Sequence, residues 1–348
     1  MFGGNVFGTG LRLSARPHTS ALCGVSCVVL NADHGGCVLE YLMVLGGLVG
    51  LFFGGEALVR GSVGIAQRMA MPPLLIGLTV VGFGTSTPEL LVSVGAALRG
   101  VPDIALGNVI GSNIANILLI VGLSSLVWPI RVSGDTLKRD TAVMMVAAVV
   151  LIPVFALGEI GRVAGTILFI ALVAYLVFAY RQSRKAPIAD ENDLSSLGDR
   201  PQMAMPVALV WVVGGLAALM VGADFMVDGA VTIARTFGVS EAFIGLTIVA
   251  VGTSLPELAT SLIAALRKQS EIAIGNIVGS NIFNILGILG LTAVIAPIPV
   301  ASRFITFDLP VMIAVSLVLT LLLRRPVIGR GIGIVMLIGY AGYVWSAR

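Results

Sequence analysis

The chain contains two copies of one segment, separated by 168 residues. Shifting the sequence by that distance superposes Ile76 to Leu123 on Ile244 to Leu291 without a gap, and 30 of the 48 aligned positions are identical. The register extends upstream at lower identity, where Gly54 and Gly61 match Gly222 and Gly229. A repeat this clear predicts two homologous halves that fold alike.

The composition is that of a membrane protein. Hydrophobic residues make up 57% of the chain and charged residues only 11%, whereas a soluble domain is nearer about 25% charged. A helix that crosses a bilayer needs about 20 apolar residues, and ten apolar stretches occupy most of the length. They run approximately over Val38–Leu58, Pro72–Leu98, Ile104–Val127, Thr141–Ala156, Val163–Tyr180, Ala204–Val227, Glu241–Leu266, Ile272–Ile295, Ile305–Leu323 and Gly331–Trp345.

Ten spans in two sets of five predict an all-α polytopic membrane protein built from two inverted five-helix repeats. Because five is an odd number, the second copy enters the membrane the opposite way round. Inverted repeats are typical of secondary transporters, whose binding site lies near the membrane midplane. The predicted organisation is a poorly ordered leader over 1–37, a first repeat over 38–180, a polar cytoplasmic linker over 181–202 and a second repeat over 203–348.

All three cysteines and both histidines lie in the leader. Their absence from the membrane body excludes thiol catalysis, Ser-His and Cys-His dyads and zinc-type histidine clusters there. The spacing of Cys23, Cys27, His34 and Cys37 fits no usual zinc-finger pattern, so we assign the leader no metal site and no function.

The distribution of basic residues predicts the orientation. Fourteen Lys and Arg residues fall in loops after the odd-numbered spans, and five fall on the opposite side beyond the leader. Cytoplasmic loops carry the excess of basic residues. Both ends of the membrane body are therefore expected outside the cytoplasm, in the cell inner membrane, with the linker inside.

The second span of each half carries a motif that should break its helix. Gly84-Thr85-Ser86-Thr87-Pro88-Glu89 is matched by Gly252-Thr253-Ser254-Leu255-Pro256-Glu257. Proline removes a backbone donor, and the glycine four residues earlier loosens the same turn. Freed carbonyls within a membrane must line a cavity or meet a partner, which makes those of Gly82 and Ala250 candidate cation ligands. Helical spacing puts the hydroxyls of Thr85 and Ser86 on the face of Glu89, and those of Thr253 and Ser254 on the face of Glu257.

Glu89 and Glu257 are the only two of the 18 acidic residues that fall well inside a predicted span. Glu56, Asp224 and Asp228 lie near span ends, and we expect them to be interfacial and to reach water. A charge at the membrane centre costs roughly 3 kcal/mol on insertion scales. Since no Lys, Arg or His is predicted at comparable depth, a cation from outside the protein is the expected partner of the two carboxylates.

The third span of each half adds a polar stripe. Asn108, Ser112 and Asn116 are spaced by four residues and share one helix face, and Asn276, Ser280 and Asn284 repeat the pattern. Two carboxylates, two carbonyls and the amides of Asn116 and Asn284 supply about six to eight oxygens, the number that Ca2+ prefers. Helix packing or backbone bonding would explain any one of these residues alone. Duplication of the whole set at one offset favours ion binding.

At these residues the sequence resembles the cation:calcium antiporter superfamily, which includes the sodium/calcium exchangers. GTSTPE with GNVIGSNIAN, and GTSLPE with GNIVGSNIFN, look like the two alpha repeats of that family. The resemblance implies exchange of Ca2+ against Na+ or H+ by alternating access, with the first and sixth spans moving against the rest and with no cofactor. The metal ligands that it implies are Glu89, Thr85, Ser86, the Gly82 carbonyl, Ser112 and Asn116 in the first repeat, and Glu257, Thr253, Ser254, the Ala250 carbonyl, Ser280 and Asn284 in the second.

The chain departs from the family pattern at two amides. Sodium/calcium exchangers typically resemble it except for an Asp at the position of Asn284, and potassium-dependent relatives carry Asp at the position of Asn116 too. The amides lower the negative charge of the site, which leaves the Na+ stoichiometry and the driving ion open. The short linker also lacks room for the calcium-sensing domains of animal exchangers.

The expected function is secondary active antiport of Ca2+ against Na+ at a midplane site, and the chain is not expected to be an enzyme. Within transporters, the alternative is H+/Ca2+ antiport in which the same two glutamates carry the protons. Two other classes are an intramembrane hydrolase with Glu89 or Glu257 as general base, disfavoured without a membrane His or Cys, and a passive channel. The expected partners are membrane lipid and the transported ions, with no nucleic acid, and the protein should function as a monomer.

Overall fold

The computed structural model describes residues 38–69, 71, 73–131, 135–185, 203–238 and 250–346. The predicted leader, most of the predicted linker and the first part of the span expected at Glu241–Leu266 lie outside the described residues. The described helices are α1 (Val38–Met69), α2 (Pro73–Ile76), η1 (Gly77–Val81), α3 (Gly82–Thr85), α4 (Thr87–Leu98), α5 (Pro102–Ala115), η2 (Asn116–Ile120), α6 (Val121–Val127), α7 (Asp135–Ala156), α8 (Arg162–Lys185), α10 (Met205–Thr236), α12 (Ala250–Gly252), α13 (Leu255–Leu266), α14 (Ser270–Ile282), η4 (Phe283–Leu289), α15 (Gly290–Ile295), η5 (Phe304–Asp308), α16 (Leu309–Leu322) and α17 (Arg330–Ser346), and the strands are β1 (Ile130–Arg131), β2 (Glu159–Ile160), β3 (Ile298–Pro299) and β4 (Val327–Ile328).

Within the described residues, seven helices are long and apolar enough to cross a membrane, or eight if one bent pair counts as a single span. The protein is therefore a mostly helical membrane protein. The predicted count of ten stays a prediction. Of the two other expected spans, Glu241–Leu266 is described only from Ala250 onward, and Gly331–Trp345 corresponds to α17, which has 17 residues.

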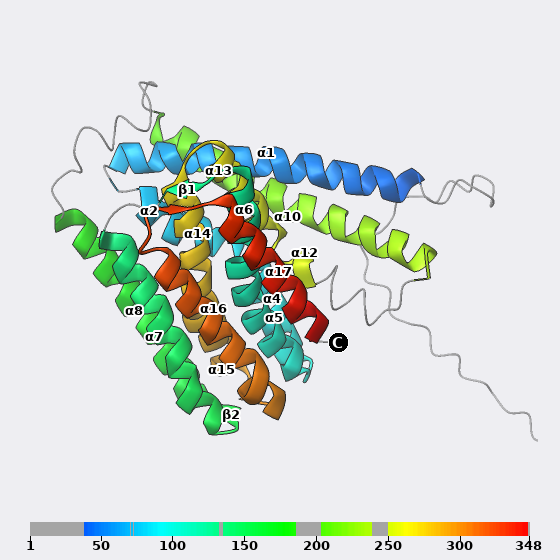
Figure 1. The fold of residues 1–348 in the computed structure, drawn as a ribbon, viewed down its shortest axis with the longest axis vertical. Coiled ribbons are helices and arrows are strands. Elements are labelled where there is room, and N and C mark those ends of the chain that lie inside the picture. Colours follow the sequence, from blue (N-terminus) through cyan, green and yellow to red (C-terminus); the bar gives the residue numbers. More distant parts are fainter. Residues whose placement is uncertain are drawn as a thin grey trace, which may run out of the picture. The chain divides into compact units, whose positions relative to one another are not determined.

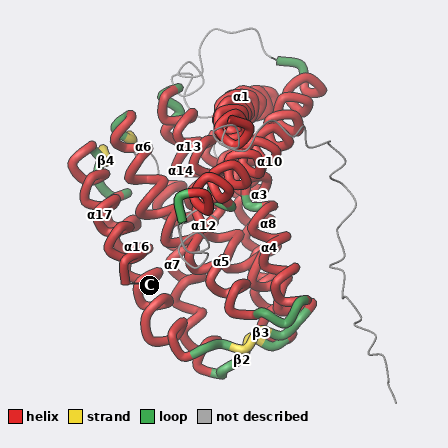
Figure 2. The backbone as a smooth tube through the Cα atoms, turned by 90° about the vertical axis from the view of Figure 1, so that its right-hand side faces the viewer, coloured by secondary structure: helices red, strands yellow, loops and turns green. Residues whose placement is uncertain are grey.

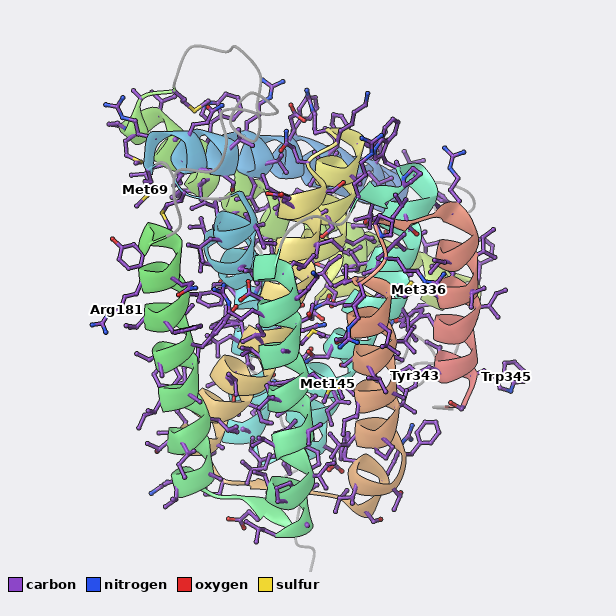
Figure 3. The ribbon with its side chains drawn as sticks, turned by 60° about the vertical axis from the view of Figure 1, so that its left-hand side comes forward. Met69, Met145, Arg181, Met336, Tyr343 and Trp345 are labelled. Atoms are coloured by element: carbon purple, nitrogen blue, oxygen red, sulfur yellow. The ribbon has the colours of Figure 1, made fainter. Side chains whose placement is uncertain are left out.

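The burial pattern is that of a protein with lipid around it. Large apolar side chains are exposed on the outer helices, among them Val163 on α8 (76%) and Val335 on α17 (68%). Figure 3 shows Arg181 and Trp345 also pointing away from the helices that carry them. Many polar side chains, by contrast, are buried between helices. An apolar exterior around a polar interior is the arrangement that a bilayer favours.

The second predicted span is broken where the motif predicts. The helical segments Leu74–Thr85 and Thr87–Leu98 meet at an angle of 44°, and Ser86 between them leaves the helical conformation with φ −82° and ψ 9°. The cause lies in Pro88, whose nitrogen cannot donate to the preceding turn. In the second copy, α12 ends at Gly252 and α13 begins at Leu255, so the chain turns at the same point of the motif.

The third span of each half is a long helix with a π-helical segment in its middle. Helices α5, η2 and α6 form one span over Pro102–Val127, and α14, η4 and α15 form its copy over Ser270–Ile295. The π-helical segments η2 and η4 contain Asn116 and Asn284. Short π-helical insertions are rare and occur frequently at functional sites.

Helices α1 and α10 pack face to face through glycines and run crosswise to α7, α8 and α16 (Figure 1). A Cβ added at Gly47 would lie 2.6 Å from the Gly222 carbonyl oxygen, and one added at Gly215 would lie 2.6 Å from the Leu58 nitrogen. Gly47 and Gly215 are themselves 168 residues apart, so each helix presents the same contact to the other. Small residues of this kind let two membrane helices approach closely.

Two short antiparallel ladders join the halves at opposite ends of the helices (Figure 2). In β1 and β4, Ile130 pairs with Ile328; in β2 and β3, Ile160 pairs with Ile298. Ile130 and Ile298 are 168 residues apart, as are Ile160 and Ile328. The second ladder is therefore the first one with the roles of the halves exchanged. In each ladder, the two paired loops are also loops that the distribution of basic residues assigns to the same side of the membrane.

We predict that Gly215→Val lowers the thermal unfolding midpoint of the purified protein, since its side chain would press on the backbone of α1. Overpacking of this kind costs about 1–3 kcal/mol. The matched control is Gly214→Val, because a Cβ on the adjacent, exposed Gly214 meets no described atom within 4 Å. Equal midpoints for the two variants would contradict the packing assigned to α1 and α10.

Candidate ion-binding site

Two buried carboxyl groups form the centre of the site, one from each half. Glu89 in the first turn of α4 and Glu257 in the first turn of α13 are each 1% exposed. Each receives a hydroxyl from the opposite half: Ser86 Oγ donates to Glu257 Oε1 at 2.8 Å, and Ser254 Oγ donates to Glu89 Oε1 at 3.2 Å. Each half therefore depends on the other to complete its site.

The crossing of these hydroxyls is a difference from the sequence analysis, which grouped each serine with the glutamate of its own helix. Ser86 and Ser254 are the N-cap residues of α4 and α13, yet neither makes a side-chain capping bond. An N-cap serine ordinarily accepts a hydrogen bond from its own helix. Here the 44° bend turns the cap of the first half toward the second half, and its hydroxyl finds a stronger acceptor there.

Two asparagines that the sequence analysis left out of the ligand set hold the broken helices in place. Asn108 Nδ2 donates to the Glu89 carbonyl oxygen at 3.0 Å and to Ser93 Oγ at 2.9 Å. Asn276 Nδ2 makes the matching bonds to the Glu257 carbonyl and Ser261 Oγ, at 3.3 and 2.9 Å. The sequence does contain a signal for this role, since Asn108 and Asn276 stand 168 residues apart at the same position of the two repeats. Both amides fix the helix turn that carries the carboxyl group.

Four oxygens of the predicted ligand set are buried without a hydrogen-bond donor among the described residues. They are Glu89 Oε2, Glu257 Oε2, Asn116 Oδ1 and Asn284 Oδ1. Buried polar atoms are ordinarily hydrogen-bonded, and an unpartnered one needs a specific explanation. These four are all acceptors and stand at equivalent positions of the two repeats. Carboxylate and amide oxygens are the ligands of hard cations such as Ca2+.

The other predicted residues surround this centre. Ser112 Oγ lies 3.4 Å from Ser254 Oγ, and Ser280 Oγ donates to the Gly82 carbonyl oxygen at 3.2 Å. That carbonyl also accepts the Ser86 backbone N–H at 3.2 Å, so it is less free than the break predicts. Ala250 begins α12, directly after residues that lie outside the described part.

The two predicted threonines bond to the positioning asparagines. Thr85 Oγ1 donates to Asn276 Oδ1 at 3.2 Å, and Thr253 Oγ1 donates to Asn108 Oδ1 at 3.5 Å. Both contacts again join one half to the other. The threonines thus help to orient the amides that hold the helix turns of the two glutamates.

A cavity of about 550 Å³ reaches the site from the end where β2 and β3 lie. Its lining includes Asp103, Asn108, Ser112, Thr253, Asp308 and Tyr343, and it extends to Ala301 beside β3. The copies of several lining residues are sealed: Asn276, Ser280, Thr85 and Asp140 are at most 1% exposed. The site is therefore open toward the β2·β3 end and closed toward the β1·β4 end.

Two further acidic side chains are buried, a feature that the sequence analysis missed. Asp140 is 0% exposed and pairs with Arg139 at 2.8 Å, and Asp308 is 3% exposed and pairs with Arg303 at 3.3 Å. The Tyr343 hydroxyl donates to Asp308 at 3.1 Å. These carboxylates have a guanidinium beside them, whereas no Lys or Arg side chain of the described residues pairs with Glu89 or Glu257. The 168-residue spacing of Asp140 and Asp308 was the signal in the sequence.

Within the described residues, no three or more His, Cys, Asp or Glu side chains come together in a group that could hold a metal ion. The site therefore consists of two carboxyl groups among neutral hydroxyl and amide oxygens. It has no soft ligand for a transition metal, and its hard oxygens suit alkali and alkaline-earth cations. The cysteines and histidines of the leader lie outside the described residues.

Comparison with known proteins yields matches over both halves. The family model described as sodium/calcium exchanger protein matches residues 39–181 and 207–347. Inner membrane protein YrbG of Escherichia coli is 38% identical, with 89% of this chain and 96% of that protein covered. The sodium/calcium exchanger MaX1 of Methanosarcina acetivorans is 33% identical, with 88% and 97% covered. A solved structure of the sodium-calcium exchanger NCX_Mj superposes with a TM-score of 0.77 at 34% identity, covering 89% of this chain and 99% of that one.

We predict that Ser86→Ala and Ser254→Ala lower the thermal stability by similar amounts, because each removes the hydroxyl that donates to the carboxyl group of the opposite half. A hydrogen bond to a charged group contributes about 1.5–3 kcal/mol. Ser316→Ala is the control, since that buried hydroxyl donates only to the Met312 carbonyl of its own helix. Unfolding midpoints in detergent test this. If the unfolding midpoints of the two site variants equalled that of the Ser316 variant, the crossed hydrogen bonds would contribute no more to stability than a bond within one helix.

Proposed function

The chain belongs to the sodium/calcium exchanger family, and from that premise we propose that it is a Ca2+ antiporter whose transported ions bind between Glu89 and Glu257. The relatives that its sequence and fold match include exchangers rather than enzymes. The observation that carries the proposal is the set of four buried acceptor oxygens with no described donor. A cation is the partner that such a set favours.

Antiport follows from the mutual exclusion of the ions. One group of negative oxygens can be neutralised by one divalent cation or by monovalent cations in its place, but not by both in full. A neutralised site can cross the low-dielectric barrier, whereas an uncompensated pair of carboxylates cannot. The cavity at one end and the sealed packing at the other support alternating access, in which the loaded site opens to each side in turn.

The charge of the site supports an exchange of one Ca2+ for two monovalent ions. Glu89 and Glu257 are the two carboxylates that frame it, and the positions that could add a third are the amides Asn116 and Asn284. Two negative charges are balanced by one Ca2+, or equally by two Na+ or two H+. We propose Na+ as the counter-ion, on the names of the family and of MaX1. Proton exchange is the second candidate, because two protonated glutamates would also be neutral.

The membrane topology is part of the proposal. We propose ten spans in two inverted repeats, in the cell inner membrane, with both ends of the membrane body outside the cytoplasm and a functional monomer. Support comes from the exchanged registers of the two ladders, the match to an inner membrane protein and the distribution of basic residues. In this orientation the cavity opens to the outside.

We predict that Glu89→Gln or Glu257→Gln lowers Ca2+ exchange in proteoliposomes to background. Each change removes one of two charges that balance a divalent ion while it keeps the shape of the side chain. The measurement is Ca2+ flux driven by Na+ and pH gradients imposed separately. Glu159→Gln, on an exposed carboxylate of β2, is the control. Flux near the parental rate in either site variant counts against the proposal, and flux without any counter-ion gradient would favour a channel.

We predict that exchange by the parental protein is electroneutral and that Asn284→Asp makes it respond to voltage. The third carboxylate would call for an additional monovalent ion, so that one net charge moves per cycle, which is worth about 2.3 kcal/mol per 100 mV. Ca2+ flux at membrane potentials clamped with K+ and valinomycin tests both statements. Asn116→Asp, the copy of this change in the first repeat, should behave alike. Parental flux that depends strongly on voltage would exclude the two-charge balance.

A further inference from the structure

An ion pair holds α1 against the end of α13 on the sealed side of the molecule. Arg267 Nε donates to Glu56 Oε2 at 2.8 Å, and Arg267 Nη2 donates to Glu56 Oε1. Glu56 is only 8% exposed, so the expectation that it is an interfacial residue that reaches water is wrong. Paired hydrogen bonds between Arg and a carboxylate are among the stronger polar contacts. Arg60, one turn along α1, also donates to Glu56.

The repeat places the same charges at the other end of the molecule. The position of Glu56 is occupied in the second half by Asp224 on α10, and that of Arg267 is occupied in the first half by Arg99 after α4. Both Asp224 and Arg99 are exposed, and within the described residues they form no ion pair with each other. One of the two equivalent pairs is therefore formed and the other is separated.

The helices that carry these pairs differ in the same way. Helix α1 packs along α13, where a Cβ added at Gly55 would lie 3.1 Å from the Ile263 side chain. The equivalent contact, between α10 and α4, is at most marginal. Arg99 stands four residues before Asp103, which lines the cavity. The formed pair thus lies at the sealed end and the separated pair at the open end.

We propose that Glu56–Arg267 and Asp224–Arg99 are two alternately formed latches, which make these four side chains positioning residues of the transport cycle. Glycine contacts lock α1 and α10 together, so the two helices move as one body. A shift that brings α10 onto α4 closes the cavity and forms the Asp224–Arg99 pair. By the inverted symmetry, the same shift draws α1 off α13 and separates Glu56 from Arg267. Each latch stabilises the conformation in which its own end is closed.

The pairs also differ in net charge, and that difference fits the two ends. Arg60 supports Glu56, but its counterpart in the second half is Asp228. The sealed-side latch therefore carries one extra positive charge, and the open-side latch carries one extra negative charge. A net negative charge at the open end raises the local concentration of cations there.

The test reads the minor conformation directly, through a cysteine that is reachable only when the sealed end opens. Thr260 is 0% exposed, and its counterpart in the first half is Val92 on the cavity wall. The full chain carries Thr260→Cys with the three leader cysteines replaced by serine, and its modification by a membrane-permeant maleimide is timed in liposomes. Because the rate follows the population of the conformation open at that end, it reports a shift of the equilibrium in either direction.

Opposite effects are expected from the two latches. Arg267→Gln should raise the Thr260→Cys rate roughly two- to fivefold, and Arg99→Gln should lower it by a similar factor, as the loss of a partly exposed ion pair implies. Val92→Cys should respond in the reverse sense. Arg324→Gln is the matched control and should change neither rate, since Arg324 is an exposed arginine before β4, at the same end, and forms no ion pair within the described residues.

A second variant distinguishes the loss of the ion pair from the cost of leaving the buried Glu56 carboxylate without Arg267. Glu56→Gln combined with Arg267→Gln removes both charges of the pair, and Arg60, whose side chain is 44% exposed, can be hydrated instead. The double variant should keep the raised rate because the latch is gone; a return to the parental rate overturns the proposal. Rates that stay unchanged, or that move in the same direction for Arg99→Gln and Arg267→Gln, also overturn it. Arg99 is exposed and forms no ion pair within the described residues, so its variant decides the matter even if Arg267→Gln fails to fold.

The inference rests on the proposed antiport cycle only for the need to open at both ends. Labelling requires no transported ion, so the two proposals fail separately. Absent Ca2+ exchange with the expected labelling pattern would overturn the proposed function and leave the latches standing, whereas normal exchange with unchanged labelling would do the reverse.

Discussion

Two buried carboxyl groups, one from each half of a membrane protein, determine which side chains the surrounding structure must supply. Glu89 and Glu257 are each 1% exposed and are each bonded by a serine of the opposite half, and no basic side chain of the described residues pairs with either. Asp140 and Asp308 show the ordinary solution, in which an adjacent guanidinium neutralises the buried acid. The absence of that solution at the centre is the physical reason for proposing a cation from outside the protein as the partner of the two carboxyl groups.

The crossed serines explain why a duplicated sequence yields one site and not two. Ser86 completes Glu257 and Ser254 completes Glu89, so neither carboxyl group is fully bonded within its own half. The bent helices make this possible, because each break delivers a cap serine and a carboxyl group to the same level of the membrane. The π-helical segments of the neighbouring helices add Asn116 and Asn284 to the candidate site.

Much of this could be predicted from the sequence because it depends on local chemistry and on the repeat. Pro88 determines the break, and the 168-residue offset makes every feature of one half a prediction for the other. Contacts made across the fold could not be predicted. The partner of Glu56 is 211 residues away, and only packing decides that Ser86 bonds to Glu257. The assignment of the set as ion ligands stays a prediction.

The two strand ladders restrict the kind of motion open to this molecule. At each end of the helices, backbone hydrogen bonds fasten a loop of one half to a loop of the other. If one whole half rocked against its twin, both fastenings would tear, with unpaired backbone groups left behind. Helices α1 and α10 lie outside these fastenings. The ladders thereby join the two halves at both ends of the helices, and sliding of α1 and α10 against the other helices is the motion that they leave free.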